Sequence, residues 1–211
     1  VAALNFLENK FDGLKTNNIK ILYDMGGIYK SFEKYDEAIK IYSKLLDLLD
    51  NRSKAYADIL YRRGGSFERI GDYETADKDL LDSLNITREN PYVLNYLAYS
   101  WLERNYKIEL SMEMLKEAYD LRKNDPYITD SLGWGYYLIN DFENAEKYLK
   151  KAVELMPYDP IVNDHYGDIL WMLNRKIQAR YFWNNVLNLD ETDDEMKIDV
   201  KKKIIYGIEK T

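Results

Sequence analysis

The chain has 211 residues, and the 46% that are hydrophobic are enough to form a continuous core. Its 30 Lys and Arg against 37 Asp and Glu give a formal net charge of −7, which argues against a general binder of phosphate backbones because such proteins present a basic stripe. There is no cysteine, which excludes disulfides and thiolate metal sites. No apolar run approaches the roughly 18 residues of a membrane span, so we predict no span within these residues.

The first predicted helix covers residues 1–15, where large apolar residues recur on one helical stripe. They are Leu4, Leu7, Phe11 and Leu14. The polar residues 16–18 interrupt this pattern. Because the chain starts at Val1 and already inside a helix, we interpret residues 1–18 as part of an upstream structural unit of a longer protein.

From residue 19 onward, the sequence repeats itself at intervals of 34 to 38 residues. Each interval contains a small residue, a large apolar residue three positions later, and a second small residue further on. The first small residues of successive intervals are Gly26, Gly64, Ala98, Gly133 and Gly167. A fixed period of this length predicts units of two helices that stack on one another.

The fourth interval carries a recognisable set of residues: Leu132, Gly133, Tyr136, Ala145, Leu149, Ala152 and Pro157. This pattern resembles the tetratricopeptide repeat (TPR), a unit of two antiparallel helices. The resemblance implies an all-α fold, a right-handed α-solenoid. The expected units are residues 19–56, 57–90, 91–125, 126–159 and 160–191. Residues 192–211, acidic at their start and lysine-rich further on, are expected to form a helix that caps the last unit.

The segment from Asp130 to Asp168 also resembles the C-terminal repeats of long bacterial TPR proteins. Some of those proteins are outer-membrane lipoproteins that act as adaptors for periplasmic processing proteases. The resemblance therefore favours a bacterial adaptor and a periplasmic location, whereas the residues themselves leave the cytoplasm and the periplasm equally open.

Glycine inside a helix costs about 1 kcal/mol relative to alanine, so the mid-helix glycines require a compensating contact. We expect the second helix of each unit to approach closely and to pack its own small residue against the glycine backbone. These small residues are Ala38, Ala76, Ala145 and Ala179.

Few residues point to catalysis or metal binding. The only histidine, His165, lies between Asp164 and Asp168. A metal site needs three or more convergent ligands, and we interpret these residues as a solvated helix surface. The glycines follow the repeat rather than a phosphate-binding loop, and no serine lies in a nucleophile elbow. The prediction is a protein that is not an enzyme and that uses no metal or cofactor.

The TPR resemblance implies that the first helix of each unit lines a concave groove. The predicted partner-binding residues at groove positions are aromatic, acidic or amide side chains: Tyr92, Asn95, Tyr99, Asp130, Trp134, Tyr137, Asp164, Asp168 and Trp171. We expect Trp134 and Trp171 to be exposed and to supply large contact area. The carboxylates favour a protein or peptide that offers lysine, arginine or a free amino group. Nucleic acid is not expected, because the aromatic residues follow the repeat period and the charge has the wrong sign.

The sequence therefore predicts a non-catalytic scaffold or adaptor that binds a protein or peptide. It differs from chaperone-binding TPR domains, because the positions of their carboxylate clamp hold other residues: Tyr23, Gly27, Asp58 and Arg62. One alternative is a self-associating homo-oligomer, in which an N-terminal edge exposing Leu7 and Phe11 forms the interface. An enzyme with an unrecognised site and an RNA-binding repeat protein are less favoured alternatives.

Overall fold

The structure is a computed structural model that describes residue 6 and residues 15–208. The stripe predicted over residues 1–15, including Leu7 and Phe11, therefore lies outside the described residues.

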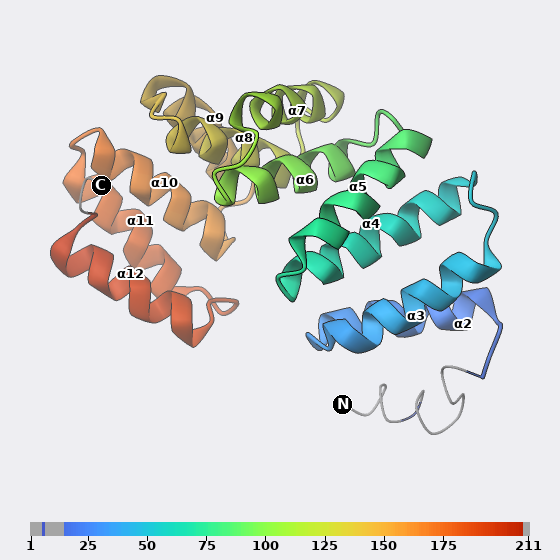
Figure 1. The fold of residues 1–211 in the computed structure, drawn as a ribbon. Coiled ribbons are helices and arrows are strands. Elements are labelled where there is room, and N and C mark those ends of the chain that lie inside the picture. Colours follow the sequence, from blue (N-terminus) through green and yellow to red (C-terminus); the bar gives the residue numbers. More distant parts are fainter. Residues whose placement is uncertain (1–5, 7–14, 209–211) are drawn as a thin grey trace. The chain divides into compact units, whose positions relative to one another are not determined.

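The described residues form eleven α-helices and no strand, which confirms the all-α class (Figure 1). In chain order they are α2 (Ile19–Ser31), α3 (Tyr35–Leu48), α4 (Lys54–Arg69), α5 (Tyr73–Ile86), α6 (Pro91–Glu103), α7 (Ile108–Leu121), α8 (Pro126–Leu138), α9 (Phe142–Leu155), α10 (Pro160–Met172), α11 (Lys176–Asn188) and α12 (Asp194–Tyr206). Consecutive helices pack as pairs, α2 with α3, α4 with α5, α8 with α9 and α10 with α11. The exact boundaries of the repeat units stay a prediction.

Local sequence signals determine where most helices begin. A side-chain oxygen before the first turn accepts a hydrogen bond from a backbone N–H that has no partner within the helix. The residues that do this are Asn18, Ser53, Asp72, Asp125, Asp141, Asp159 and Asp193. α6, α8 and α10 also begin with proline, whose missing N–H is not needed at that position.

The short turns inside all four of these pairs contain a residue in the left-handed region, and in the turn between α2 and α3 it is Glu33, with a φ of 57°. Gly71 follows α4 with a φ of 81°, while Asn140 and Asn174 follow α8 and α10 with a φ of 62°. Glycine adopts this conformation without a steric cost, and asparagine tolerates it better than most residues. Each of these pairs therefore reverses direction over three residues: 32–34, 70–72, 139–141 and 173–175.

The chain divides into two compact units, which we describe separately. Unit 1 comprises residues 1–97 and unit 2 comprises residues 98–211, with the boundary inside α6. The core of unit 1 lies between α2, α3 and α4 and includes Tyr42. The core of unit 2 gathers side chains from α9 to α12 and includes Trp183.

The mid-helix glycines make room for a large side chain of the partner helix, and Gly64 also lies against the predicted alanine, through the backbone of Ala76. A Cβ atom added to Gly26 would overlap the ring of Tyr42, and one added to Gly167 would overlap the indole of Trp183. Tyr42 and Trp183 are fully buried, and each lies four residues after the alanine that we expected at the contact. Helical side chains lean toward the N-terminus of their helix, so the residue one turn further along covers the glycine.

Neighbouring glycines of α2 provide a matched test of this packing. We expect Gly26→Ala to lower the free energy of unfolding by about 1–3 kcal/mol, because its Cβ displaces the buried ring of Tyr42. Gly27→Ala should raise it by about 0.5–1 kcal/mol, since its Cβ would meet nothing within 4 Å and alanine favours the helix. Urea denaturation of both variants measures the difference, and equal midpoints would contradict the packing described.

Candidate partner-binding site

The predicted site residues are distributed over both units. Tyr92 and Asn95 belong to unit 1, where Tyr92 is 45% exposed and Asn95 is half-buried. Tyr99 is half-buried in unit 2. The remaining six residues lie on α8 and α10 of unit 2, and the structure brings most of them together in one cluster.

The centre of this cluster is a stack of aromatic rings. The Trp134 indole lies nearly parallel to the Tyr137 ring, with 4.5 Å between centroids, and to the His165 imidazole at 4.0 Å. Its Nε1 donates a hydrogen bond of 2.7 Å to Glu103. Trp134 is consequently half-buried rather than exposed as predicted, because ring stacking covers much of its surface.

His165 is buried, which corrects the prediction of a solvated helix surface. Its Nδ1 lies 2.8 Å from Oδ2 of Asp130, and only 9% and 8% of the two side chains are exposed. Burial opposes a positive charge on the imidazole, but the Asp130 carboxylate, assisted by Asp164 and Asp168, outweighs it and raises the pKa of His165. Asp130 is therefore occupied by an internal partner.

The other two predicted carboxylates are occupied by a lysine of α12. Lys203 Nζ donates to Asp164 Oδ2 at 2.7 Å and to both oxygens of Asp168 at 2.8 Å. The indole of Trp183 adds a hydrogen bond of 3.0 Å to Asp168. Burial, together with the neighbouring Asp164, raises the pKa of Asp168 to about 6. The acidic pair that we expected to face a partner is thus engaged by an internal cation.

Trp171 is also covered, by the residues that follow α12, which corrects the prediction of an exposed ring. Its Nε1 donates to the carbonyl oxygen of Ile208 at 3.1 Å, and the side chain is half-buried. Gly207, with a φ of 80°, lies so close to the indole that an added Cβ would overlap it. The lysine-rich terminal helix was visible in the sequence, but its effect on Trp171, Asp164 and Asp168 was not.

Two of the most exposed large side chains of α8 and α10 lie in the first turns of these helices. Tyr127 is 57% exposed and Ile161 is 53% exposed. Tyr127 precedes Trp134 by seven residues, so the two share one face of α8. We call Tyr127, Trp134, Tyr137 and Ile161 the aromatic face of unit 2.

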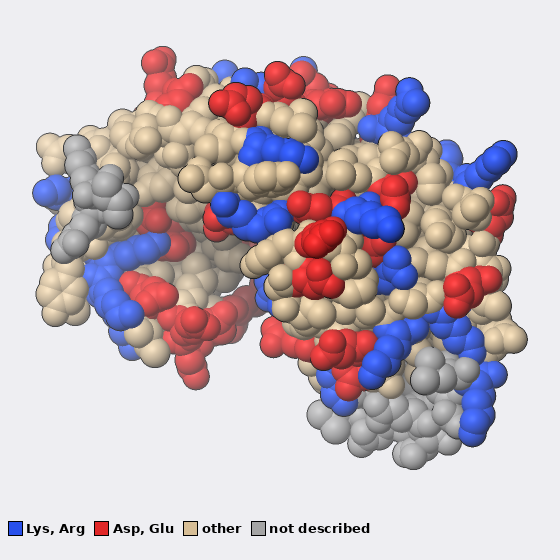
Figure 2. Space-filling view, in the orientation of Figure 1, with Lys and Arg blue, Asp and Glu red and all other residues tan. Residues whose placement is uncertain are grey.

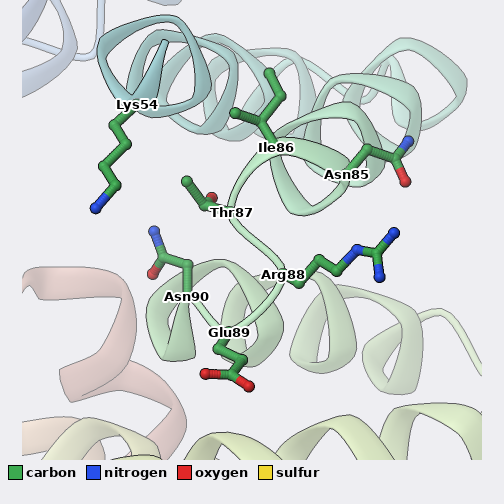
Figure 3. A pocket seen from close by; sticks show the side chains of 7 residues that line it. All are labelled: Lys54, Asn85, Ile86, Thr87, Arg88, Glu89 and Asn90. Atoms are coloured by element: carbon green, nitrogen blue, oxygen red, sulfur yellow. The ribbon is translucent and has the colours of Figure 1, made fainter. Parts of the chain in front are cut away.

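Charged side chains and a shallow pocket also lie outside the aromatic face. Basic and acidic side chains are interspersed in the view of Figure 2, and neither sign forms an extended field there. A shallow pocket of unit 1 is lined by Lys54 and by residues 85–90, between the start of α4 and the α5–α6 connection (Figure 3). Across residues 15–208, no group of three or more His, Cys, Asp or Glu could hold a metal ion, and no helix is long and apolar enough to cross a membrane.

The buried His165–Asp130 pair predicts a pH-dependent stability. Because the pKa of His165 is raised in the folded state, its contribution is present below the ordinary value of about 6.5 and is lost as the pH rises through the folded-state value. We expect the parent chain to lose more stability than His165→Gln between pH 6 and pH 8.5 in urea titrations. The packing that His165→Gln loses lowers its stability at both pH values and so does not affect the change with pH. Asp168 titrates in both proteins. A pH-independent difference between them would contradict a charged His165.

Comparison with known proteins identifies the helix pairs. The sequence profile of the tetratricopeptide repeat family matches residues 19–48, which form α2 and α3, and residues 131–159, which include most of α8 and all of α9. A TPR repeat-containing protein of Pseudomonas aeruginosa is 29% identical over 120 residues, or 57% of this chain and 18% of that protein. The chain therefore spans less than a fifth of the length of this curated relative.

Solved structures share the fold at lower identity. A thermophilic TPR protein of Thermus thermophilus matches with a TM-score of 0.75 and 16% identity, covering 89% of this chain and 99% of that chain. PilF of Pseudomonas aeruginosa matches with a TM-score of 0.70 and 19% identity, covering 90% and 85%. MamA of Desulfovibrio magneticus RS-1 matches with a TM-score of 0.65 and 17% identity, covering 85% and 98%. Identities this low show a common fold and no more. The profile matches and the packed helix pairs show that this chain contains tetratricopeptide repeats.

Proposed function

We propose that the protein is a non-catalytic scaffold that binds a protein or peptide through the aromatic face of unit 2. The observation that carries the proposal is the exposure of Tyr127 and Ile161 on the two helices that form the aromatic stack, whereas most of the other large apolar residues of these helices are buried or half-buried. Exposed aromatic and branched side chains on rigid helices give large contact area at a low entropic cost. TPR folds are generally protein-interaction scaffolds.

The contacts inside unit 2 change the expected chemistry of the partner. The preference for a basic or free-amine partner was based on Asp130, Asp164 and Asp168, and each of them is paired with His165 or Lys203. Carboxylates that already hold an internal cation attract a further cation less strongly. We therefore propose that apolar and aromatic contacts, rather than a salt bridge, dominate recognition at this face.

A pair of matched double variants tests the location of the site. Tyr127→Ala with Ile161→Ala removes the exposed side chains of the aromatic face, while Tyr181→Ala with Ile177→Ala removes a tyrosine and an isoleucine from the surface of α11, where they are 62% and 87% exposed. None of the four side chains is buried, so both variants should melt like the parent. In pull-downs from a lysate of the source organism, we expect the first variant to lose the partner and the second to retain it. If the second variant lost the partner and the first retained it, the binding surface would lie on α11 instead.

Self-association is the second candidate, and exposed apolar residues of the last two helices favour it. They are Ile177, Tyr181, Ile198, Ile205 and Tyr206. Apolar surface at the end of a repeat array promotes association between copies. Sedimentation over a range of concentrations separates the two candidates. A homo-oligomer of the parent chain that dissociates in the Ile177→Ala, Tyr181→Ala variant would support self-association.

A further inference from the structure

Unit 1 contains a half-buried lysine that has no partner among the described residues. Lys30 lies in the last turn of α2, and it forms no hydrogen bond or ion pair with any residue that the structure describes. An ammonium group that is partly removed from water and left unpaired is costly, so native proteins normally place a carboxylate beside it. Lys30 is therefore a candidate for pairing with a group from outside the chain.

The charges around Lys30 do not neutralise it. Arg62 donates to Asp58 at 2.8 Å and lies 4.6 Å above the Tyr23 ring. Arg69 donates to the Tyr35 hydroxyl at 3.3 Å.

The carboxylate that favours the Lys30 charge is that of Glu68, and it accepts a hydrogen bond of 2.9 Å from Tyr96. Asp58 is thus paired with Arg62 and Glu68 is hydrogen-bonded to Tyr96, and neither carboxylate forms an ion pair with Lys30. Burial lowers the pKa of Lys30, and the guanidinium groups of Arg62 and Arg69 lower it further.

The Lys30 ammonium group lies against a glycine and an aromatic ring. A Cβ added to Gly65 on α4 would lie 3.6 Å from Lys30 Nζ and 3.4 Å from the Tyr96 ring, in ordinary contact with both. Tyr61 packs edge to face against Tyr96, with 5.8 Å between ring centroids. On α2, a Cβ added to Gly27, one turn before Lys30, would meet nothing within 4 Å, so the helix surface beside Lys30 is uncovered there.

We propose that Lys30 and its surroundings form an anion site that binds a carboxylate side chain of an acidic peptide segment. The unpaired ammonium group matches one carboxylate, and a charge-assisted hydrogen bond would compensate the burial of the lysine. A nucleic acid fits less well, since a polyanion requires an extended basic surface and the chain carries a net charge of −7. The site lies in unit 1 and goes beyond the proposed function, because it does not depend on the aromatic face of unit 2.

The test measures the affinity for a short fluorescent peptide in which Glu alternates with Tyr and Leu, with both ends blocked. Lys30→Gln should weaken binding roughly tenfold, the effect of losing one charge-assisted hydrogen bond. Lys40→Gln is the matched control, since it makes the same charge change at an exposed lysine of α3 and should leave the affinity within about twofold. The peptide with Gln in place of Glu should bind neither the parent nor the variants. Lys30→Gln removes an unpaired charge, so it should melt at or above the temperature of the parent.

A second measurement reports directly on the pKa of the Lys30 ammonium group. NMR titration of the lysine side chains should find the pKa of Lys30 below the ordinary lysine value in the free protein and raised when the Glu peptide is added. Equal affinities of Lys30→Gln and Lys40→Gln, no binding of the Glu peptide, or an unmoved Lys30 signal would each overturn the anion site. Tighter binding of an oligouridylate than of the Glu peptide would also overturn it in favour of RNA. None of these outcomes bears on the aromatic face, whose variants lie in unit 2.

Discussion

The helix pairs of this protein depend on one packing constraint. The first helix must lack a side chain at one position so that the second can place a large side chain against its backbone. Gly26 with Tyr42 and Gly167 with Trp183 satisfy this constraint with buried aromatic rings. Glycine costs the helix about 1 kcal/mol, but burying a large apolar side chain gains about 1.5–3 kcal/mol, so the exchange is favourable. The same contact determines which faces of the first helix are left for other contacts. Gly27, which does not face Tyr42, is an example.

Internal pairing decides which charges are available for recognition. In unit 2, Asp164 and Asp168 receive the ammonium of Lys203, and the buried Asp130 receives His165. Pairs of this kind fix one helix against another and contribute little field outside the protein. In unit 1, by contrast, Lys30 stays unpaired among the described residues although the chain as a whole is acidic. Net charge is therefore a poor guide to the local chemistry of either surface.

The related structures share the helical scaffold at less than 20% identity, which is expected when spacing and packing define the fold. The residues that recur with the repeat are small or apolar, and they pack between helices. Recognition depends on the side chains left between them, and these are specific to each chain. For this reason we base the aromatic face and the anion site on contacts within this protein rather than on its neighbours.

The sequence by itself determined the helical repeat and its family. Period, caps and prolines act over one or two helices, and residues such as Asp125, Pro126 and Gly133 carry that information locally. The sequence also indicated that a further helix, α12, would follow the pair of α10 and α11. Only the tertiary structure decided which groove residues are accessible, because that depends on partners 31 to 39 residues away, as for Trp134 with Glu103 and Lys203 with Asp164. A side chain on an exposed stripe of one helix can be buried by the next, and no local pattern records that contact.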